Sequence, residues 1–191
     1  MNVKTVSAVP ALAPAAASVV ERARRGDQQA FAALVRQYDR GLRALAYRLV
    51  GDRDRMEDAL QEAYVSAFRA LPRFRGDSDL STWLYRIAFN ACLDELERSR
   101  KLVHLPLAEI ADTAGNDELV ERLATRRALA RALAALPLED RAAVLLVDAE
   151  GFSYADAAQI LAVPEGTVAS RLNRARASLR RALGDRPEGA A

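Results

Sequence analysis

The chain has 191 residues, of which 51% are hydrophobic and 6% aromatic, and its formal net charge is +2. This length allows one ordinary domain or two small ones, and a single cysteine excludes a disulfide framework within the chain, as suits a reducing cytoplasm. Cys92 lies in an apolar run and is interpreted as a core residue, and without a Cys/His cluster no zinc site or cofactor is expected. Because alanine and leucine supply much of the apolar content, we expect an all-α fold.

Residues 1–24 are predicted to form a disordered tail. The stretch 1–20 is rich in Ala and Val, like a signal peptide, but its charged start is weak and Pro10 and Pro14 interrupt the apolar run. No segment reaches the roughly 18 uninterrupted apolar residues of a membrane span. We therefore expect a cytoplasmic protein.

The next part of the chain is predicted to begin with two helices. Apolar residues recur at spacings of three and four over 27–50, which predicts a helix that Gly51 ends. A second helix is expected up to Leu71, where a proline follows, with Asp52 or Asp54 as its N-terminal cap.

A loop over 73–80 and a third helix complete a first small domain, 25–98. Ser81 or Thr82 can cap this third helix, which is expected to end near Arg98. The following stretch, 99–126, is irregular and acidic, and we interpret it as a flexible linker between domains.

A second small helical domain is predicted over 127–184, followed by a tail, 185–191. Its helices are expected before Pro137 and over 139–149, 154–161 and 167–183. The last two helices, joined by a tight turn, have the order of a helix-turn-helix motif.

The last helix presents a polar face opposite its apolar seam. Such a convex surface suits a DNA major groove, with central side chains reading bases and flanking arginines binding phosphates. A basic helix that is exposed only to solvent is the alternative interpretation. The residues on this polar face and its flanks are Ser170, Arg171, Asn173, Arg174, Arg176 and Arg181.

Two surfaces of the first domain also attract attention. Acidic and amide side chains project from the second helix, away from its apolar stripe, although ordinary solvent exposure explains them equally well. On the third helix, Trp83, Arg86 and Asn90 share one stripe beside the loop 74–78. Aromatic, cationic and polar groups together suit single-stranded nucleic acid, whereas Trp83 as a plain core residue is the alternative.

Three segments, in order, resemble those of sigma factors, the bacterial proteins that carry RNA polymerase to promoters. The segment 54–64 reads DRMEDALQEAY and resembles their polymerase-binding segment. The loop FRGD at 74–77, followed by STWLYRIA at 81–88, resembles their −10 recognition segment. Leu136 and Pro137, with GTVASRLNRAR at 166–176, resemble their −35 recognition domain. The order and spacing are those of the extracytoplasmic function (ECF) group of the sigma-70 family.

The resemblance implies two helical domains, sigma domains 2 and 4, joined by a flexible linker. It also implies an alternative sigma factor that binds core RNA polymerase, recognises promoter DNA and promotes its melting, for a stress- or signal-responsive regulon. An anti-sigma factor, anchored in the cytoplasmic membrane, would hold it inactive.

The resemblance assigns a role to each surface. Core polymerase would bind the polar face of the second helix, at Asp54, Asp58, Gln61 and Glu62. The −10 element would be bound by Phe74, Arg75, Asp77, Ser78, Trp83, Arg86 and Asn90. The −35 element would be bound by Thr167, Ser170, Arg171, Asn173, Arg174, Arg176 and Arg180. Among these, Asn173 and Arg174 are expected to read bases.

Other classes of protein fit less well. A stand-alone helix-turn-helix regulator leaves the acidic face and the Trp83 loop without a role. A helical adaptor that binds only proteins leaves the arginines of the last helix unexplained. An enzyme is disfavoured because the sequence offers no nucleophile–base pair, metal cluster or phosphate-binding glycine loop.

Overall fold

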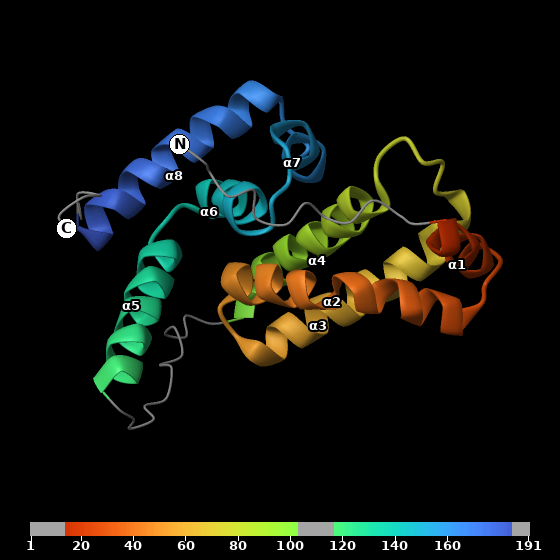
Figure 1. The fold of residues 1–191 in the computed structure, drawn as a ribbon, viewed down its shortest axis with the longest axis horizontal. Helices are drawn as coiled ribbons and strands as arrows, with labels where there is room; N and C mark the ends of the chain where they lie inside the picture. Colours follow the sequence, from red (N-terminus) through yellow and green to blue (C-terminus); the bar gives the residue numbers. More distant parts are fainter. Residues whose placement is uncertain (1–13, 103–116, 185–191) are drawn as a thin grey trace.

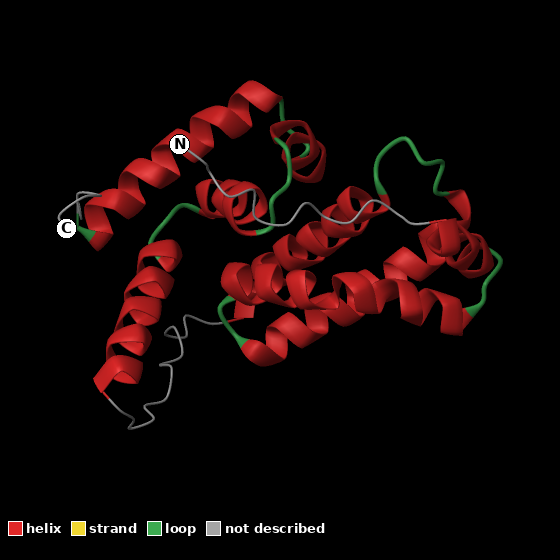
Figure 2. Ribbon diagram, in the orientation of Figure 1, coloured by secondary structure: helices red, strands yellow, loops and turns green. Residues whose placement is uncertain are grey.

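The computed structural model describes residues 14–102 and 117–184, and every regular element in these two ranges is helical (Figures 1 and 2). The predicted linker residues 103–116 and the outer parts of both predicted tails, 1–13 and 185–191, lie outside the described residues. In the first range the helices are α1 (Pro14–Arg24), α2 (Gln28–Val50), α3 (Arg53–Ala70) and α4 (Leu80–Leu102). In the second range they are α5 (Asp117–Ala134), α6 (Leu138–Val144), α7 (Tyr154–Leu161) and α8 (Glu165–Leu183).

Helices α2, α3 and α4 pack on one another as the core of the first domain (Figure 1). Asp27 caps α2 by accepting the Ala30 N–H at 2.9 Å, and Gly51 ends it with a φ of 78°. Asp52, and not Asp54, caps α3, because its carboxylate accepts the Arg55 N–H at 2.9 Å. The core is built from fully buried leucines: Leu34, Leu42, Leu45, Leu49 and Leu60.

The start of α4 differs from the prediction. The helix begins at Leu80, so Ser81 and Thr82 lie inside it, and both side chains are buried. Neither residue is therefore the N-terminal cap, because both side chains are buried against other parts of the protein. The helix also continues past Arg98 to Leu102.

The helix α1 occupies 14–24, a stretch that the sequence analysis assigns to a disordered tail, so this part of the prediction is wrong. It packs against α2, and Ala23 is buried in that contact. Its alanines favour a helix, and Pro14 stands at its first position, where a missing N–H is tolerated.

Three elements of the second domain begin elsewhere than predicted or change their winding. Helix α5 begins at Asp117, inside the predicted linker. Helix α6 continues into a π-helical turn, Leu145–Ala149, after which the Glu150 N–H donates to the Leu145 carbonyl at 3.0 Å. Helix α8 begins at Glu165, two residues before the predicted start.

The two domains contact each other through α4 and α7. The rings of Tyr85 and Phe152 meet edge to face, with centroids 4.7 Å apart, and the Tyr85 hydroxyl donates to Glu150 at 2.8 Å. Thr82, only 2% exposed, donates to Asp156 at 3.2 Å. Burial and the Glu150 carboxylate both raise the pKa of Tyr85, so its hydroxyl stays protonated and able to donate.

Cys92 is buried in the core of the first domain, as the sequence analysis predicts. Burial raises its pKa to about 12, so it is a packing residue. In the described ranges no helix is both long enough and apolar enough to cross a membrane.

Candidate protein- and nucleic-acid-binding surfaces

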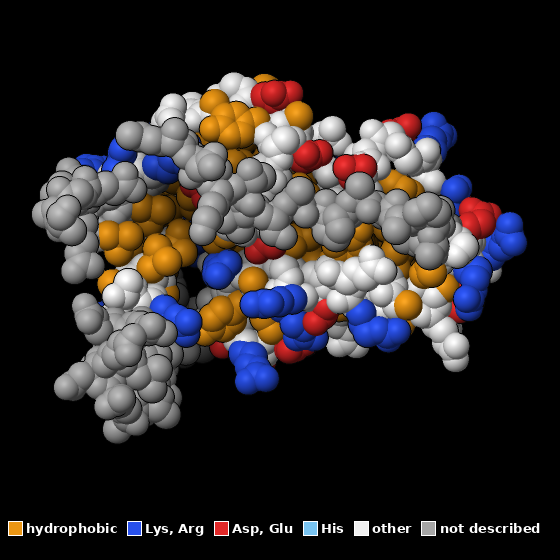
Figure 3. All heavy atoms as spheres, viewed as in Figure 1, with side chains coloured by type: hydrophobic (Ala, Val, Ile, Leu, Met, Phe, Trp, Pro, Cys, Tyr) orange, Lys and Arg blue, Asp and Glu red, His pale blue; other side chains and the backbone are white. Residues whose placement is uncertain are grey.

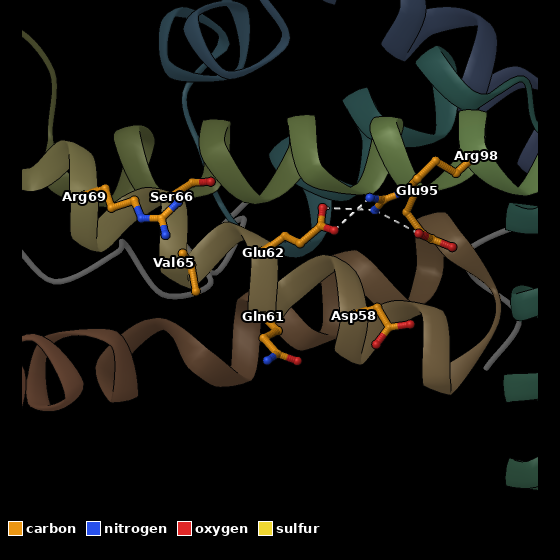
Figure 4. A pocket seen from close by; sticks show the side chains of 8 residues that line it. All are labelled: Asp58, Gln61, Glu62, Val65, Ser66, Arg69, Glu95 and Arg98. Carbon is orange, nitrogen blue, oxygen red and sulfur yellow. Dashed lines mark hydrogen bonds and ion pairs between the residues drawn. The ribbon is translucent and has the colours of Figure 1, made fainter.

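A groove between α3 and α4 carries most of the predicted acidic surface. All four predicted side chains of α3 are exposed. Asp58, Gln61 and Glu62 line the groove, whereas Asp54 does not. The groove is completed by residues that the sequence analysis missed: Val65, Ser66, Arg69, Glu95 and Arg98 (Figure 4).

Glu62 and Arg98 face each other across this groove (Figure 4). The two Nη atoms of Arg98 donate to the two carboxylate oxygens of Glu62 at 2.7 and 3.0 Å, and Arg98 also contacts Glu95 at 3.0 Å. The hydrogen bond from Arg98 lowers the pKa of Glu62. The acidic surface is therefore partly neutralised by its own neighbour, while Asp58 and Gln61 point away from Arg98 in Figure 4.

Behind the groove, a polar network fixes α3 against α2. The Tyr64 hydroxyl donates to Asp39 at 2.8 Å. Arg43 donates to Asp39 at 2.9 Å and to Glu57 at 2.5 Å. Since one network joins residues of both helices, the exposed face of α3 has a fixed orientation on the domain.

The loop between α3 and α4 presents polar groups above an aromatic support. Arg75 and Asp77 are exposed, while Phe74 and Ser78 are partly buried. Trp83 is only 7% exposed, and its ring centroid lies 5.1 Å from that of Phe74. In this conformation Trp83 therefore supports the loop from the core, as the alternative interpretation holds.

Two further −10 candidates, Arg86 and Asn90, are exposed on α4. Trp83 is buried while these two side chains are exposed, so the three residues of the predicted stripe do not share one exposed surface.

Helix α8 places its polar residues on the side away from the core. Val168, Leu172 and Ala175 are buried. Ser170, Asn173, Arg174 and Arg180 are exposed, whereas Thr167, Arg171 and Arg176 are partly exposed. The Ser170 hydroxyl donates to the Thr167 carbonyl at 2.9 Å.

Two of the arginines on α8 are paired with carboxylates. Arg174 binds Asp140 of α6 through Nε at 3.1 Å and Nη2 at 2.8 Å. Arg176 binds Asp148 of the π-helical turn in the same way, at 3.0 and 2.6 Å. Arg171, Asn173 and Arg180 have no hydrogen-bond or ion-pair partner among the described residues. The sequence analysis missed both aspartates, which lie 34 and 28 positions from their partners.

Both domains of this chain match families of known proteins. A Sigma-70 region 2 family model matches residues 34–102, and a Sigma-70, region 4 model matches residues 126–179. The ECF RNA polymerase sigma factor SigM of Mycobacterium tuberculosis is 46% identical over 159 residues, which cover 83% of this chain and 80% of SigM. The chain belongs to the ECF group of sigma factors.

Two solved structures resemble that of this chain. CnrH, in complex with the cytosolic domain of CnrY, gives a TM-score of 0.67 at 26% identity and covers 87% of this chain and 95% of CnrH. RpoE of Bartonella quintana, in complex with the anti-sigma factor NepR, gives a TM-score of 0.62 at 30% identity, covering 76% and 91% of the two chains. Sigma factors act in transcription initiation and are not enzymes, which agrees with the sequence interpretation.

Proposed function

We propose that this sigma factor binds core RNA polymerase through the groove between α3 and α4, and that it works in the cytoplasm. The carrying observation is the exposed set of Asp58, Gln61 and Glu62, held in place by the network behind α3. Asp54, just outside the groove, would extend the same surface. Val65, 44% exposed within the groove, adds an apolar contact for a protein partner.

The experiment is co-purification with core polymerase. The double variant Asp58→Arg with Glu62→Arg reverses the charge of the groove, and we expect it to lose core binding while its helical content and unfolding temperature are retained. Arg36→Glu, an exposed change on α2 outside the groove, is the matched control. Undiminished co-purification of the double variant would refute the assigned surface.

Promoter recognition is proposed to divide between the two domains. The exposed loop residues Arg75 and Asp77, with Phe74 and Ser78 beside them, would hold an unstacked −10 base. Arg86 and Asn90 would contact the same strand, and Trp83 would support the loop. Permanganate footprinting tests this role, because Asn90→Ala should leave core binding intact and reduce the reactivity of −10 thymines.

Helix α8 is proposed to enter the major groove of the −35 element. Asn173 and Arg174 would read bases, and Thr167, Ser170, Arg171, Arg176 and Arg180 would position the helix on phosphates. A phosphate variant such as Arg180→Ala should weaken binding to all sequences alike and flatten the salt dependence, whereas a base-reading variant should affect one position.

An anti-sigma factor is proposed to hold this sigma factor inactive until a stress or signal arrives. The support comes from the structural relatives, since RpoE is solved with the anti-sigma factor NepR, and CnrH with the cytosolic domain of CnrY. A membrane-anchored inhibitor is the form we propose. Affinity capture from solubilised membranes, with the tagged sigma factor as bait, tests it: an inhibitor recovered only from the soluble fraction contradicts the anchor.

A further inference from the structure

Asp140 is a buried carboxylate on α6, the helix that packs against α8. Its side chain is 8% exposed, and Arg174 is its ion-pair partner. Burying a carboxylate is unfavourable unless it is paired, and a buried ion pair contributes little more stability than an apolar pair of the same size. The stability of the domain therefore hardly explains why an aspartate stands at this position. Its effect on the orientation of Arg174 explains it directly.

The contact uses one edge of the guanidinium and leaves another free. Nε and Nη2 of Arg174 donate to the two oxygens of Asp140, so the side chain is gripped side-on. Nη1 and the second N–H of Nη2 form the end of the fork and take no part in these bonds. Arg174 is 60% exposed although its partner is buried, so the free end lies toward solvent.

A free guanidinium end matches one base in particular. Guanine presents O6 and N7 as two neighbouring acceptors in the major groove, and two parallel N–H donors bind them together. A long arginine side chain loses much conformational freedom when it is fixed against a base. Because Asp140 already fixes the guanidinium plane, part of that loss occurs on folding and not on binding.

We propose that Asp140 is a positioning residue that orients Arg174 to read one guanine of the −35 element. The proposal rests on the −35 role given above to α8. In this arrangement Asp140 never touches DNA, and it acts only through Arg174.

The molecule contains a matched control on the same helix. Asp148 holds Arg176 through the same two guanidinium atoms. However, Asp148 is 38% exposed, and Arg176 lies on the flank of α8, where a phosphate contact is proposed. Asp148→Asn removes the same charge from the same domain without touching the proposed base reader.

The test uses the full chain assembled with core polymerase and a promoter in which each −35 base pair is changed in turn. Wild-type holoenzyme should prefer a G·C pair at one position, and Arg174→Ala should abolish that preference, which a good bidentate contact sets at roughly five- to a hundredfold. Asp140→Asn should reduce the same preference, by less than Arg174→Ala does, because the guanidinium is still present but no longer fixed. Its affinity for non-promoter DNA should be equal or higher, because a negative charge near the phosphates is gone.

A double variant separates positioning from folding. In the Arg174→Ala background, Asp140→Asn should cause no further loss of preference, because the residue through which it acts is missing. Asp148→Asn should keep the wild-type preference at every position. If Asp140→Asn proves unstable, Asp140→Glu keeps the charge but displaces the carboxylate by one methylene, and it should lower the preference at the same position.

Two results would overturn the proposal: an unchanged preference in both Asp140 variants, or an equal loss at all −35 positions. The second result would assign Asp140 to the fold of the domain. If wild-type holoenzyme itself shows no −35 preference, the proposed role of α8 fails first, so the two failures are distinguishable.

Discussion

Arg141 joins the ends of two helices that belong to different domains. Its Nη1 donates to the carbonyls of Arg48 and Leu49 at the end of α2, both at 3.3 Å. Its Nη2 donates to the carbonyls of Ala134 and Leu136 at 2.7 and 3.1 Å. Carbonyls at a helix end lack partners within the helix, and a cation suits the negative end of the helix dipole.

Replacing this arginine should weaken both domains together. Arg141→Met retains the apolar stem but leaves partly buried carbonyls unpaired, so we expect the free energy of unfolding to fall by about 2–3 kcal/mol. Urea denaturation measures this change. Arg131→Met, at an exposed position on α5, should lie close to wild type; equal midpoints for the two variants would show that Arg141 is dispensable.

Cys92 provides a second prediction at the scale of one residue. With its pKa raised to about 12, the native thiol has roughly one part in ten thousand as thiolate at pH 8, and the side chain is 1% exposed. Iodoacetamide should therefore leave Cys92 of the folded chain unmodified. It should alkylate Cys92 fully once about 8 M urea has unfolded the chain. Rapid alkylation of the native protein, followed by mass spectrometry, would contradict the buried position.

The pair of helices α3 and α4 determines what the acidic groove presents to a partner. Arg98 of α4 neutralises Glu62 of α3, so a basic partner must first displace an internal cation. Arg98→Ala should free Glu62, and we expect faster association with core polymerase and a steeper dependence on salt.

Association rates measured at two salt concentrations test this expectation. Arg69→Ala, also in the groove but remote from the Glu62 contact in Figure 4, is the matched control. Slower association of Arg98→Ala than of the control would mean that Arg98 itself contacts the polymerase.

Local sequence signals predict most of the helices but not all of their ends. Apolar spacing predicts α2 and α3, and Asp52, one of the two expected caps, begins α3, whereas the cap of α2, Asp27, was not predicted. The first residue of α4 was predicted wrongly because the Thr82 side chain, expected as a cap, instead donates a hydrogen bond to Asp156, 74 positions away. Cap propensities describe neighbours along the chain, so they contain no information about such a contact.

The candidate surfaces could also be predicted only in part from the sequence. Helical periodicity correctly predicts which residues of α3 and α8 face outward. It cannot predict that Arg98, Asp140 and Asp148 bind residues of these faces, because each pair joins two different helices. The role of Trp83 was left open for the same reason, since one stripe of a helix can face either a loop or solvent.

At the scale of the whole molecule, Figure 3 shows that polar and charged side chains cover much of one face, while apolar side chains gather near α5 and α8. Leu129 of α5 and Leu183 of α8 are exposed. The contact between the domains is both aromatic and hydrogen-bonded, because Tyr85 of α4 meets Phe152 and Glu150 in the segment before α7. The two sigma domains therefore contact each other through a defined aromatic pair and a hydrogen bond, both made by Tyr85.

Gly41 of α2 is required where this contact is tightest. A Cβ at this position would overlap the Tyr85 hydroxyl and come within 2.6 Å of Glu150. Gly41→Ala should therefore displace Tyr85 from Glu150 and loosen the domain contact. We expect a larger radius of gyration in small-angle X-ray scattering.

A second glycine controls for the general effect of alanine in a helix. At Gly166 of α8 an added Cβ meets nothing within 4 Å, so Gly166→Ala should keep the radius and gain up to about 1 kcal/mol in stability. An unchanged radius in Gly41→Ala, with stability raised as in the control, would show that the contact tolerates the methyl group.

Promoter DNA and the contact between the domains impose different separations on α4 and α8. The −10 and −35 elements lie about 25 base pairs apart, which is about 85 Å along the duplex at 3.4 Å per base pair. In the structure, α7 contacts both α4 and α8, and its eight residues span about 12 Å. If the loop before α4 binds the −10 element and α8 the −35 element, as proposed, the domains have to separate before both can bind one straight promoter.

If the domains have to separate, the free energy needed to break the contact at Tyr85 and Phe152 is the same for every promoter. If about one molecule in a hundred is open at equilibrium, the apparent affinity of any partner that needs the open form falls about a hundredfold. A substitution that weakens the contact would then raise the output of weak and strong promoters by the same factor. Such a variant would behave like an increase in sigma-factor concentration, although the number of molecules and every DNA-reading side chain stay the same.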